Sequence, residues 1–426
     1  MNRTKFPKLF WIANSIEILE RFAYYGIFMG FSIYMQHLGY TRSQLGIVQS
    51  IFLFTSYFVP IFSGAFADRF GFKKVLIVSY LAYIPSILLL IFLKSYNGIV
   101  LSMLSIGFAA GIFKPLISGT IRLTTDNTNK TLGFGIFYLM VNLGASFGPI
   151  IAGYLRSISW DYAFLMAAVS ISIMFLITLL FYKEPPREIV KINIKEKFFE
   201  IFQTITDKKF AIFLILLGIF FWLPFWSFFN LAPAYVDRYI NTELLFKQIE
   251  TVFGFSFARI LAHQENNTWY INGEAIAHTG WIILLFQLIV SKIFEKKPAL
   301  QSFIFGMLIA SLGFLFMSII PNDMPYFVLL AIFIFAIGEM ISSPRIQEYI
   351  TWIAPREKAG MYMGANFLAT CIGALLSGFY TSLFGYFEKI NSPQKIWIVL
   401  SINLLVGCLI FLLFIYLAGS FKEKTE

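Results

Sequence analysis

The stretch EILERFAYYG, residues 17–26, places ionisable and aromatic side chains inside a long apolar segment. Glu17, Glu20, Arg21 and Tyr24 follow the spacing i, i+3, i+4, i+7, which gathers them on one face of a helix. An ionised side chain near the bilayer centre costs about 2.5–3.5 kcal/mol on insertion scales. A helix face with three such groups is therefore expected to line a packed polar interior or a water-filled cavity on a transport path.

Other charged residues also lie inside apolar segments. Lys114 belongs to the first half of the chain, and Glu339, Arg345 and Glu348 belong to the second, with Glu339 deepest. A cavity between the halves would offer Arg21 and Lys114 to a substrate carboxylate and Glu339 to an ammonium, which suits a zwitterion. The alternative is a set of ion pairs that only holds the helices together.

The same charges could couple transport to protons. Burial raises the pKa of a carboxyl group, and a neighbouring cation lowers it. A glutamate that alternates between a cationic partner and an unpaired pocket would bind and release a proton as the protein changes conformation. Glu17 and Glu20, beside Arg21 and Lys114, have the required parts, and the sequence leaves open which glutamate carries the proton.

The composition is that of a membrane protein. Of the 426 residues, 58% are hydrophobic and 13% are charged, against about 25% charged residues in soluble chains. The net charge of +10 sits in short loops between apolar runs, a pattern of membrane orientation rather than of nucleic-acid binding. Cys371 and Cys408 fall inside apolar segments, so no disulfide framework is expected, and the first apolar run is expected to be retained rather than cleaved. No nucleophile–base pair, metal-ligand cluster or phosphate loop stands out, so we expect neither an enzyme nor a bound cofactor.

Apolar runs long enough to span a bilayer recur along the chain. They predict an all-α membrane protein with twelve transmembrane helices, near 10–38, 44–67, 74–94, 97–122, 131–156, 160–182, 210–235, 272–294, 300–320, 326–350, 359–386 and 395–419. The charged segment 183–209 divides them into six-helix bundles at 1–182 and 210–426, and 236–270 is one long external loop, for which we expect an interfacial helix.

The distribution of basic residues predicts the orientation. With both termini in the cytoplasm, cytoplasmic segments hold 22 of the 33 Lys and Arg residues, and external loops hold eight. This excess follows the positive-inside rule. We expect an integral multi-pass protein, in the cell (inner) membrane and monomeric, whose partners are protons, lipid and a small substrate.

Two patterns resemble the major facilitator fold. Glycine and proline positions of the first half recur in the second at offsets of 225 to 229 residues, as in Gly111 and Pro115 against Gly338 and Pro344. The loop GAFADRFGFKK, residues 64–74, is similar to the signature between the second and third helices of that superfamily. The resemblance implies two parallel halves with a midplane site. It also implies a gating role for Asp68 and Arg69.

Further motifs resemble the proton-dependent oligopeptide transporters, a branch of the same superfamily. The motif E-x-x-E-R-F/Y-x-Y-Y-G matches residues 17–26, the fifth-helix signature matches FYLMVNLGASFGP, and the tenth-helix G-E-x-x-x-S-P matches residues 338–344. The resemblance implies proton-coupled uptake of di- and tripeptides. It assigns proton coupling to Glu17, Glu20, Arg21 and Lys114, and substrate contacts to Tyr24, Tyr25, Tyr57, Asn142 and Glu339.

Three positions depart from that family's pocket. Phe28 replaces an arginine, Trp226 replaces a glutamate, and Gly280 stands where an Asn-Pro pair begins. We expect a more apolar cavity, faced by Trp222 and Trp226. His278, near the third departure, is either a titrating group or an interfacial side chain with its hydrogen bonds satisfied. The alternatives to a peptide symporter are a transporter of another small organic solute that keeps the coupling motif and a non-transporting membrane sensor.

Overall fold

The computed structural model describes residues 5–126, 129–185, 199, 207–353 and 359–419. The chain forms two compact units. Unit 1 comprises residues 1–40 and 51–198, and unit 2 comprises residues 41–50 and 199–426. The boundary at residue 50 falls inside one helix, so the beginning of that helix belongs to the second unit.

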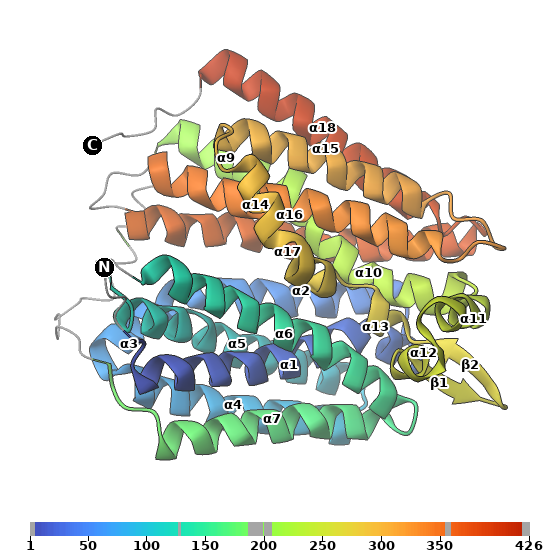
Figure 1. Ribbon diagram of the computed structural model, residues 1–426, viewed down its shortest axis with the longest axis horizontal. Coiled ribbons are helices and arrows are strands. Elements are labelled where there is room, and N and C mark those ends of the chain that lie inside the picture. The colour runs from blue at the N-terminus through green and yellow to red at the C-terminus, as the bar shows by residue number, and fades with distance from the viewer. Residues whose placement is uncertain (1–4, 127–128, 186–198, 200–206, 354–358, 420–426) are drawn as a thin grey trace. The chain divides into compact units, whose positions relative to one another are not determined.

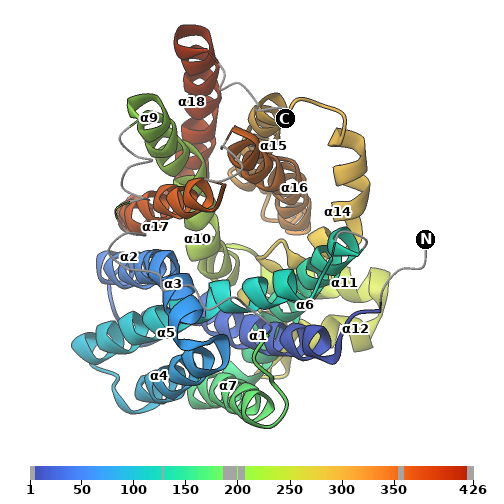
Figure 2. The same ribbon diagram turned by 90° about the vertical axis from the view of Figure 1, so that its left-hand side faces the viewer.

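Unit 1 is a bundle of long helices. α1 packs against α6 and α7, while α4 packs against α5 and α7 (Figure 2). Pro60 begins a new helix after Val59, because its ring removes a backbone donor and interrupts the helical hydrogen bonding. The helices are α1 Lys8–His37, α2 Arg42–Phe58 (shared with unit 2), α3 Pro60–Phe70, α4 Phe72–Phe92, α5 Tyr96–Leu123, α6 Lys130–Arg156 and α7 Trp160–Leu180.

Within the described residues, unit 2 holds the other helices and one small sheet (Figure 1). Its first span is continuous through a π-helical turn, η1, and α15 packs closely against α16. The elements are α9 Lys208–Leu217, η1 Gly218–Trp222, α10 Leu223–Tyr239, α11 Thr242–Phe253, α12 Phe255–Ile260, β1 Ala262–Glu265, β2 Thr268–Ile271, α13 Gly273–Ile276, α14 Gly280–Phe294, α15 Ala299–Met317, α16 Phe327–Ile353, α17 Ala359–Lys389 and α18 Lys395–Ala418.

Twelve segments have the length of membrane spans. Among the described residues, eleven are long and apolar enough to cross a bilayer by length and composition. α1 is the twelfth, and Glu17, Glu20 and Arg21 lower its hydropathy. The predicted all-α fold with twelve transmembrane helices is confirmed, and the helix ends lie within a few residues of the predicted ones.

Small residues bring α6 against α1. A methyl group at Gly144 would lie 2.4 Å from the carbonyl oxygen of Ile18, and one at Gly148 would lie 2.3 Å from that of Phe22. Both distances are far below a van der Waals contact, so only glycine allows this approach. The backbone that carries Glu17, Glu20 and Arg21 is therefore fixed by the glycines of α6.

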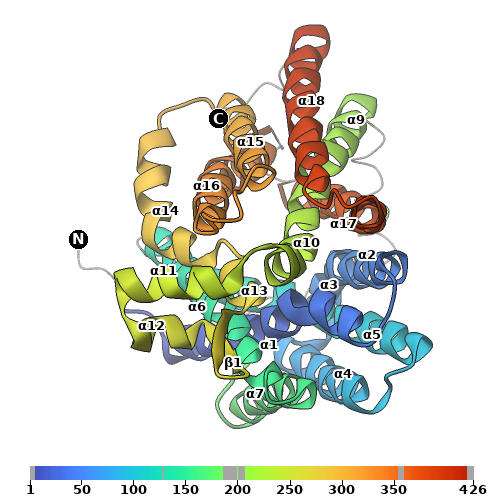
Figure 3. The ribbon, with the colours of Figure 1, turned by 90° about the vertical axis from the view of Figure 1, so that its right-hand side faces the viewer.

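The loop after α10 differs from the expected interfacial helix. Gly254, at φ +84°, breaks it into α11 and α12, because a left-handed residue ends an α-helix. An antiparallel hairpin of β1 and β2 follows, turning at Asn266 and Asn267 with φ of 47° and 65°. We call the end of unit 2 that carries this hairpin the hairpin end (Figure 3). Most of the predicted linker 183–209 lies outside the described residues.

Candidate functional site

The first polar cluster of unit 1 lies on α1. Glu17 and Glu20 are fully buried, and Arg21 Nε lies 2.6 Å from Glu17 Oε1 and 3.4 Å from Glu20 Oε2. The Tyr83 hydroxyl of α4 donates to Glu20 Oε1 over 3.5 Å. One guanidinium thus serves two carboxylates, and one oxygen of each carboxylate (Oε2) accepts no hydrogen bond from the described residues. Such a cluster has room for a proton, since protonation would remove a buried charge.

The second polar cluster surrounds Lys114 of α5. Its ammonium donates to Ser56 Oγ at 2.6 Å and lies over the Tyr57 ring at 3.9 Å and the Tyr24 ring at 4.7 Å. Tyrosine rings stabilise a cation through their quadrupole by about 0.5–2 kcal/mol, depending on desolvation. The Tyr24 and Ser56 hydroxyls are 3.3 Å apart, so this cluster meets α1 through Tyr24. Unit 1 therefore brings Glu17, Glu20, Arg21, Tyr24, Tyr57 and Lys114 into one neighbourhood.

The remaining unit 1 candidates differ in their surroundings. Tyr25 packs edge-on against Tyr24, with ring centroids 5.3 Å apart. Asn142, buried on α6, donates to the Tyr138 carbonyl of its own helix at 2.9 Å. Phe28, at the position of the missing arginine, packs against the rings of Tyr24 and Phe52. An aromatic contact thus occupies the place where a cation was expected from the family pattern.

In unit 2, aromatic side chains dominate the first span. Trp222 and Trp226 are buried and stacked, with ring centroids 6.4 Å apart and planes at 18°. Trp222 ends the π-helical turn, and such turns frequently occur at functional sites. The Trp222 Nε1–H has no acceptor among the described residues. Phe225, between the two tryptophans, contacts Phe335 of α16.

Glu339 lies one helical turn after Phe335 on α16. The Thr279 side chain lies beside its carboxylate, while its Oε2 is buried and has no hydrogen-bond partner among the residues described. His278, which precedes Thr279 in the sequence, is buried, and its Nδ1 accepts a hydrogen bond from the Gly280 N–H at 3.3 Å. Its Nε2 has no hydrogen-bond partner among the described residues. The second unit thus offers one carboxylate beside a hydroxyl, with a buried imidazole nearby in sequence.

The predicted gating pair lies at the end of α3. Arg69 is exposed, and its guanidinium lies 5.2 Å from the centre of the Phe70 ring. The side chain of Asp68 lies outside the described part of the structure. The geometry of this pair stays a prediction.

A sequence profile decides the family. The profile of the Major Facilitator Superfamily matches residues 14–378, which is most of the chain. The chain belongs to the Major Facilitator Superfamily. It is a multi-pass membrane transporter and not an enzyme.

Relatives and solved structures agree with this assignment. Quinolone resistance protein NorA of Staphylococcus aureus (strain COL) is 24% identical over 343 residues, 80% of this chain and 80% of that protein. A crystal structure of a POT family transporter in complex with 5-aminolevulinic acid superposes with a TM-score of 0.77 at 21% identity, covering 96% of each chain. A structure of the nucleoside transporter NupG has a TM-score of 0.74 at 14% identity, covering 96% of this chain and 100% of that one. These likenesses show a shared fold.

Sequence reasoning missed two side chains of the unit 1 clusters, Ser56 and Tyr83. Ser56 contacts both Lys114 and Tyr24, and Tyr83 reaches Glu20. Serine and tyrosine are common in membrane helices, so neither stands out in the sequence. Only their position opposite a charged side chain marks them.

Sequence reasoning also missed an ion-pair cluster at the hairpin end of unit 2. Arg42, at the start of α2, makes two hydrogen bonds of 2.7 and 2.8 Å to the Glu388 carboxylate of α17. The Tyr239 hydroxyl donates to the same carboxylate at 2.7 Å, and Arg238 lies 3.8 Å from it. We call these four residues the outer clamp. From the sequence, Arg42 was assigned only to an external loop, because its partner Glu388 is 346 residues away along the chain.

Beyond the outer clamp, over the next two turns of α2, this helix packs tightly on α17. A methyl group at Gly46 would lie 2.4 Å from the Gly378 carbonyl oxygen, and the Ser50 hydroxyl donates to the Leu375 carbonyl at 2.7 Å. Gln49 accepts from the Thr381 hydroxyl at 3.0 Å. This close contact explains why residues 41–50 belong to unit 2.

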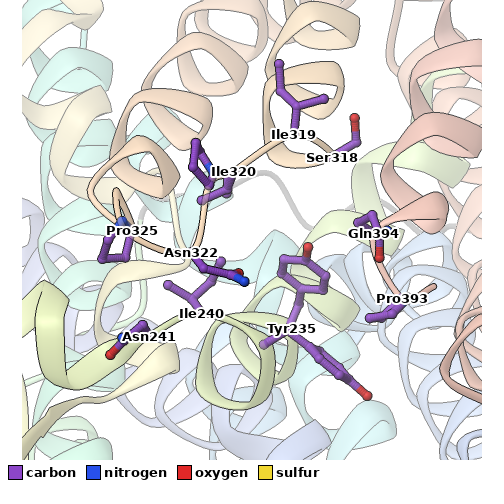
Figure 4. A pocket seen from close by; sticks show the side chains of 12 residues that line it. Tyr235, Ile240, Asn241, Ser318, Ile319, Ile320, Asn322, Pro325, Pro393 and Gln394 are labelled. Atoms are coloured by element: carbon purple, nitrogen blue, oxygen red, sulfur yellow. The ribbon is translucent and has the colours of Figure 1, made fainter. Parts of the chain in front are cut away.

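A cavity of about 440 Å³ opens at the hairpin end of unit 2 (Figure 4). It shares Tyr239 with the outer clamp, and no charged side chain lines it. None of the predicted site residues lines it either. The lining residues are Tyr235, Tyr239, Ile240, Asn241, Ser318, Ile319, Ile320, Pro321, Asn322, Pro325, Pro393 and Gln394.

Proposed function

We propose that the protein is a proton-coupled symporter of di- and tripeptides or similar small zwitterions, working by alternating access. One observation carries the proposal: the buried cluster of Glu17, Glu20 and Arg21 lies in the same unit as the Lys114 cluster. Charges inside membrane helices are costly, and a purely structural bundle would gain little from four of them. The first-helix motif supports a place in the proton-dependent oligopeptide branch.

Proton coupling would use the unsatisfied oxygens of α1. With one cation shared between Glu17 and Glu20, one carboxylate can be protonated while the other keeps Arg21. A conformational change that alters the distance to Lys114 would then change which protonation state is favoured. The driving force would be the proton gradient, with no bound cofactor.

The substrate side would combine charge with aromatic surface. Arg21 and Lys114 offer cations to a carboxylate, and Glu339 offers an anion to an amine. Tyr24, Tyr25, Tyr57, Asn142, Trp222 and Trp226 would contact the rest of the substrate. The solved relative in complex with 5-aminolevulinic acid supports a small ligand that carries one amine and one acid.

Orientation follows from the basic residues. The excess of Lys and Arg in the loops at the side of the termini supports both termini in the cytoplasm of a cell (inner) membrane. The hairpin end then faces outward, and Asp68 and Arg69 lie at the cytoplasmic mouth as gating residues. We propose a monomer as the functional form.

Uptake into proteoliposomes tests this function. Labelled dipeptides should accumulate when the outside is acidic, and an ionophore that collapses the gradient should abolish accumulation. Uptake that is independent of the gradient would overturn proton coupling. A panel of dipeptides, amino acids and organic anions at two pH values would identify the substrate.

A second candidate is a major facilitator transporter of another small organic solute that keeps the coupling clusters. The aromatic packing of Phe28 against Tyr24 and Phe52, where the peptide-transporter pattern has an arginine, favours it. Gradient-driven uptake of a non-peptide from the panel, with no uptake or competition by peptides, would select this candidate.

A further inference from the structure

The elbow between α11 and α12 exposes a run of apolar side chains. Val252 is 73% exposed, Phe253 63%, Phe257 47% and Ile260 56%. Gly254 makes the bend at which these side chains gather. An exposed apolar patch of this kind indicates an interaction surface, because leaving apolar side chains in contact with water costs free energy.

The first part of the elbow packs against its own unit. Phe246 of α11 stacks on Trp269 of β2 at 5.6 Å and 13°, and Phe255 packs edge-on against the same indole. Leu245 and Ile249 are buried on the same side of α11. These contacts hold the first part of α11, and the exposed apolar residues at its C-terminal end and in α12 follow directly from it.

An apolar groove of about 450 Å³ joins this patch to a membrane span. Its lining comes from α11, from Tyr326 just before α16 and from the first turn of α16, and it is open rather than enclosed. Tyr326 and Leu330, at that start of α16, are 43% and 39% exposed, as expected for a surface that faces lipid and for a tyrosine at the membrane interface. The lining residues are Gln248, Ile249, Thr251, Val252, Phe253, Tyr326 and Leu329.

We propose that the elbow inserts into the headgroup layer of the membrane and that the groove holds one acyl chain of a phospholipid. Because the groove continues into exposed apolar side chains at the start of the membrane span of α16, the occupant that fits it is lipid rather than a protein. Residues 242–260 carry Glu243, Lys247, Glu250 and Arg259, which sum to no net charge. Insertion is therefore driven by apolar contact, and the expected lipid is zwitterionic. In the orientation proposed above, this is the external leaflet.

Spin labels on the full chain in phosphatidylcholine vesicles test the insertion. A label at Val252→Cys or Phe257→Cys should collide more with oxygen than with a water-soluble nickel chelate. A matched label at Glu265→Cys, on the exposed hairpin strand, should show the reverse, while Cys371 and Cys408 are buried. Equal nickel accessibility at residues 252 and 265 would overturn the insertion.

The groove is tested separately with spin-labelled phosphatidylcholine. Leu329→Trp should fill the groove and lower the immobilised lipid by about one molecule per protein. Leu330→Trp, one residue away and outside the lining, is the control and should leave the immobilised lipid unchanged. An unchanged immobilised fraction in Leu329→Trp would overturn the acyl-chain site. Neither experiment measures transport, so both can be interpreted even if the symporter proposal is wrong.

Discussion

The two units use opposite means to make a candidate site. Unit 1 concentrates charge: two carboxylates, a guanidinium and an ammonium lie among hydroxyls and tyrosine rings. Unit 2 concentrates aromatic surface around Trp222 and Trp226 and keeps Glu339 as its one predicted charged site residue. We propose a division of roles, with proton coupling and the contact to the substrate carboxylate in unit 1 and selection by amine and aromatic side chain in unit 2.

The largest effect is expected for Lys114→Ala. The change removes the cation that Ser56, Tyr24 and Tyr57 surround, so the unit 1 carboxylates lose a nearby charge. Gradient-driven accumulation should fall to background, while exchange of labelled for unlabelled substrate continues. Parallel accumulation and exchange assays measure the two rates. Full accumulation in the variant would place coupling outside unit 1.

A selective effect is expected for Glu339→Gln. The amide keeps the size of the side chain and its place beside Thr279 but removes the charge. Substrates with a free amine should lose about tenfold or more in apparent affinity, since hydrogen bonds to charged groups contribute about 1.5–3 kcal/mol. Competition assays with N-acetylated and free dipeptides measure it. Equal losses for both would remove the amine-binding role.

A moderate effect is expected for Trp222→Leu. The Trp222 indole stacks with Trp226, and an aliphatic residue keeps bulk but loses the ring face and the Nε1–H. Affinity for substrates with aromatic side chains should fall about three- to tenfold, in line with about 0.5–1.5 kcal/mol for an aromatic pair. Trp222→Phe should recover part of this lost affinity, because it restores a ring face. A loss of proton coupling with unchanged affinity would contradict the division between the units.

The smallest effect is expected for Ser56→Ala. Lys114 loses one hydrogen bond of 2.6 Å and keeps its contacts with two rings. A net hydrogen bond to a charged group contributes about 1.5–3 kcal/mol, and the rings offset part of that. The pH dependence of uptake should shift while accumulation survives. An uptake-against-pH profile measures the shift, and an unchanged profile would show that Ser56 is only a packing residue.

Sequence patterns predicted most of the fold and singled out the charged side chains that the structure gathers in the unit 1 clusters. Apolar runs marked the spans because a bilayer demands long uninterrupted hydrophobic stretches, and intramembrane charges such as Glu17 and Lys114 stood out for the same reason. Ser56 and Tyr83 did not stand out, because their importance comes only from the side chain that they face.

The outer clamp and the α11–α12 elbow could not be predicted for a different reason. Arg42 and Glu388 are distant in sequence, and each alone reads as a loop charge. Gly254 breaks the expected interfacial helix through a left-handed φ, which a lone glycine in an amphipathic stretch does not specify. Long-range pairing and local backbone conformation are the two things that the periodicity of a membrane protein leaves open.

Direct observation of proton movement tests the central claim. Proteoliposomes loaded with a pH-sensitive dye, with the membrane potential clamped at zero, would receive a transported dipeptide from outside at equal pH on both sides. The account predicts that peptide entry acidifies the lumen in the wild-type protein and that Lys114→Ala shows exchange without acidification. Peptide accumulation in the wild type with no change in lumenal pH would contradict it.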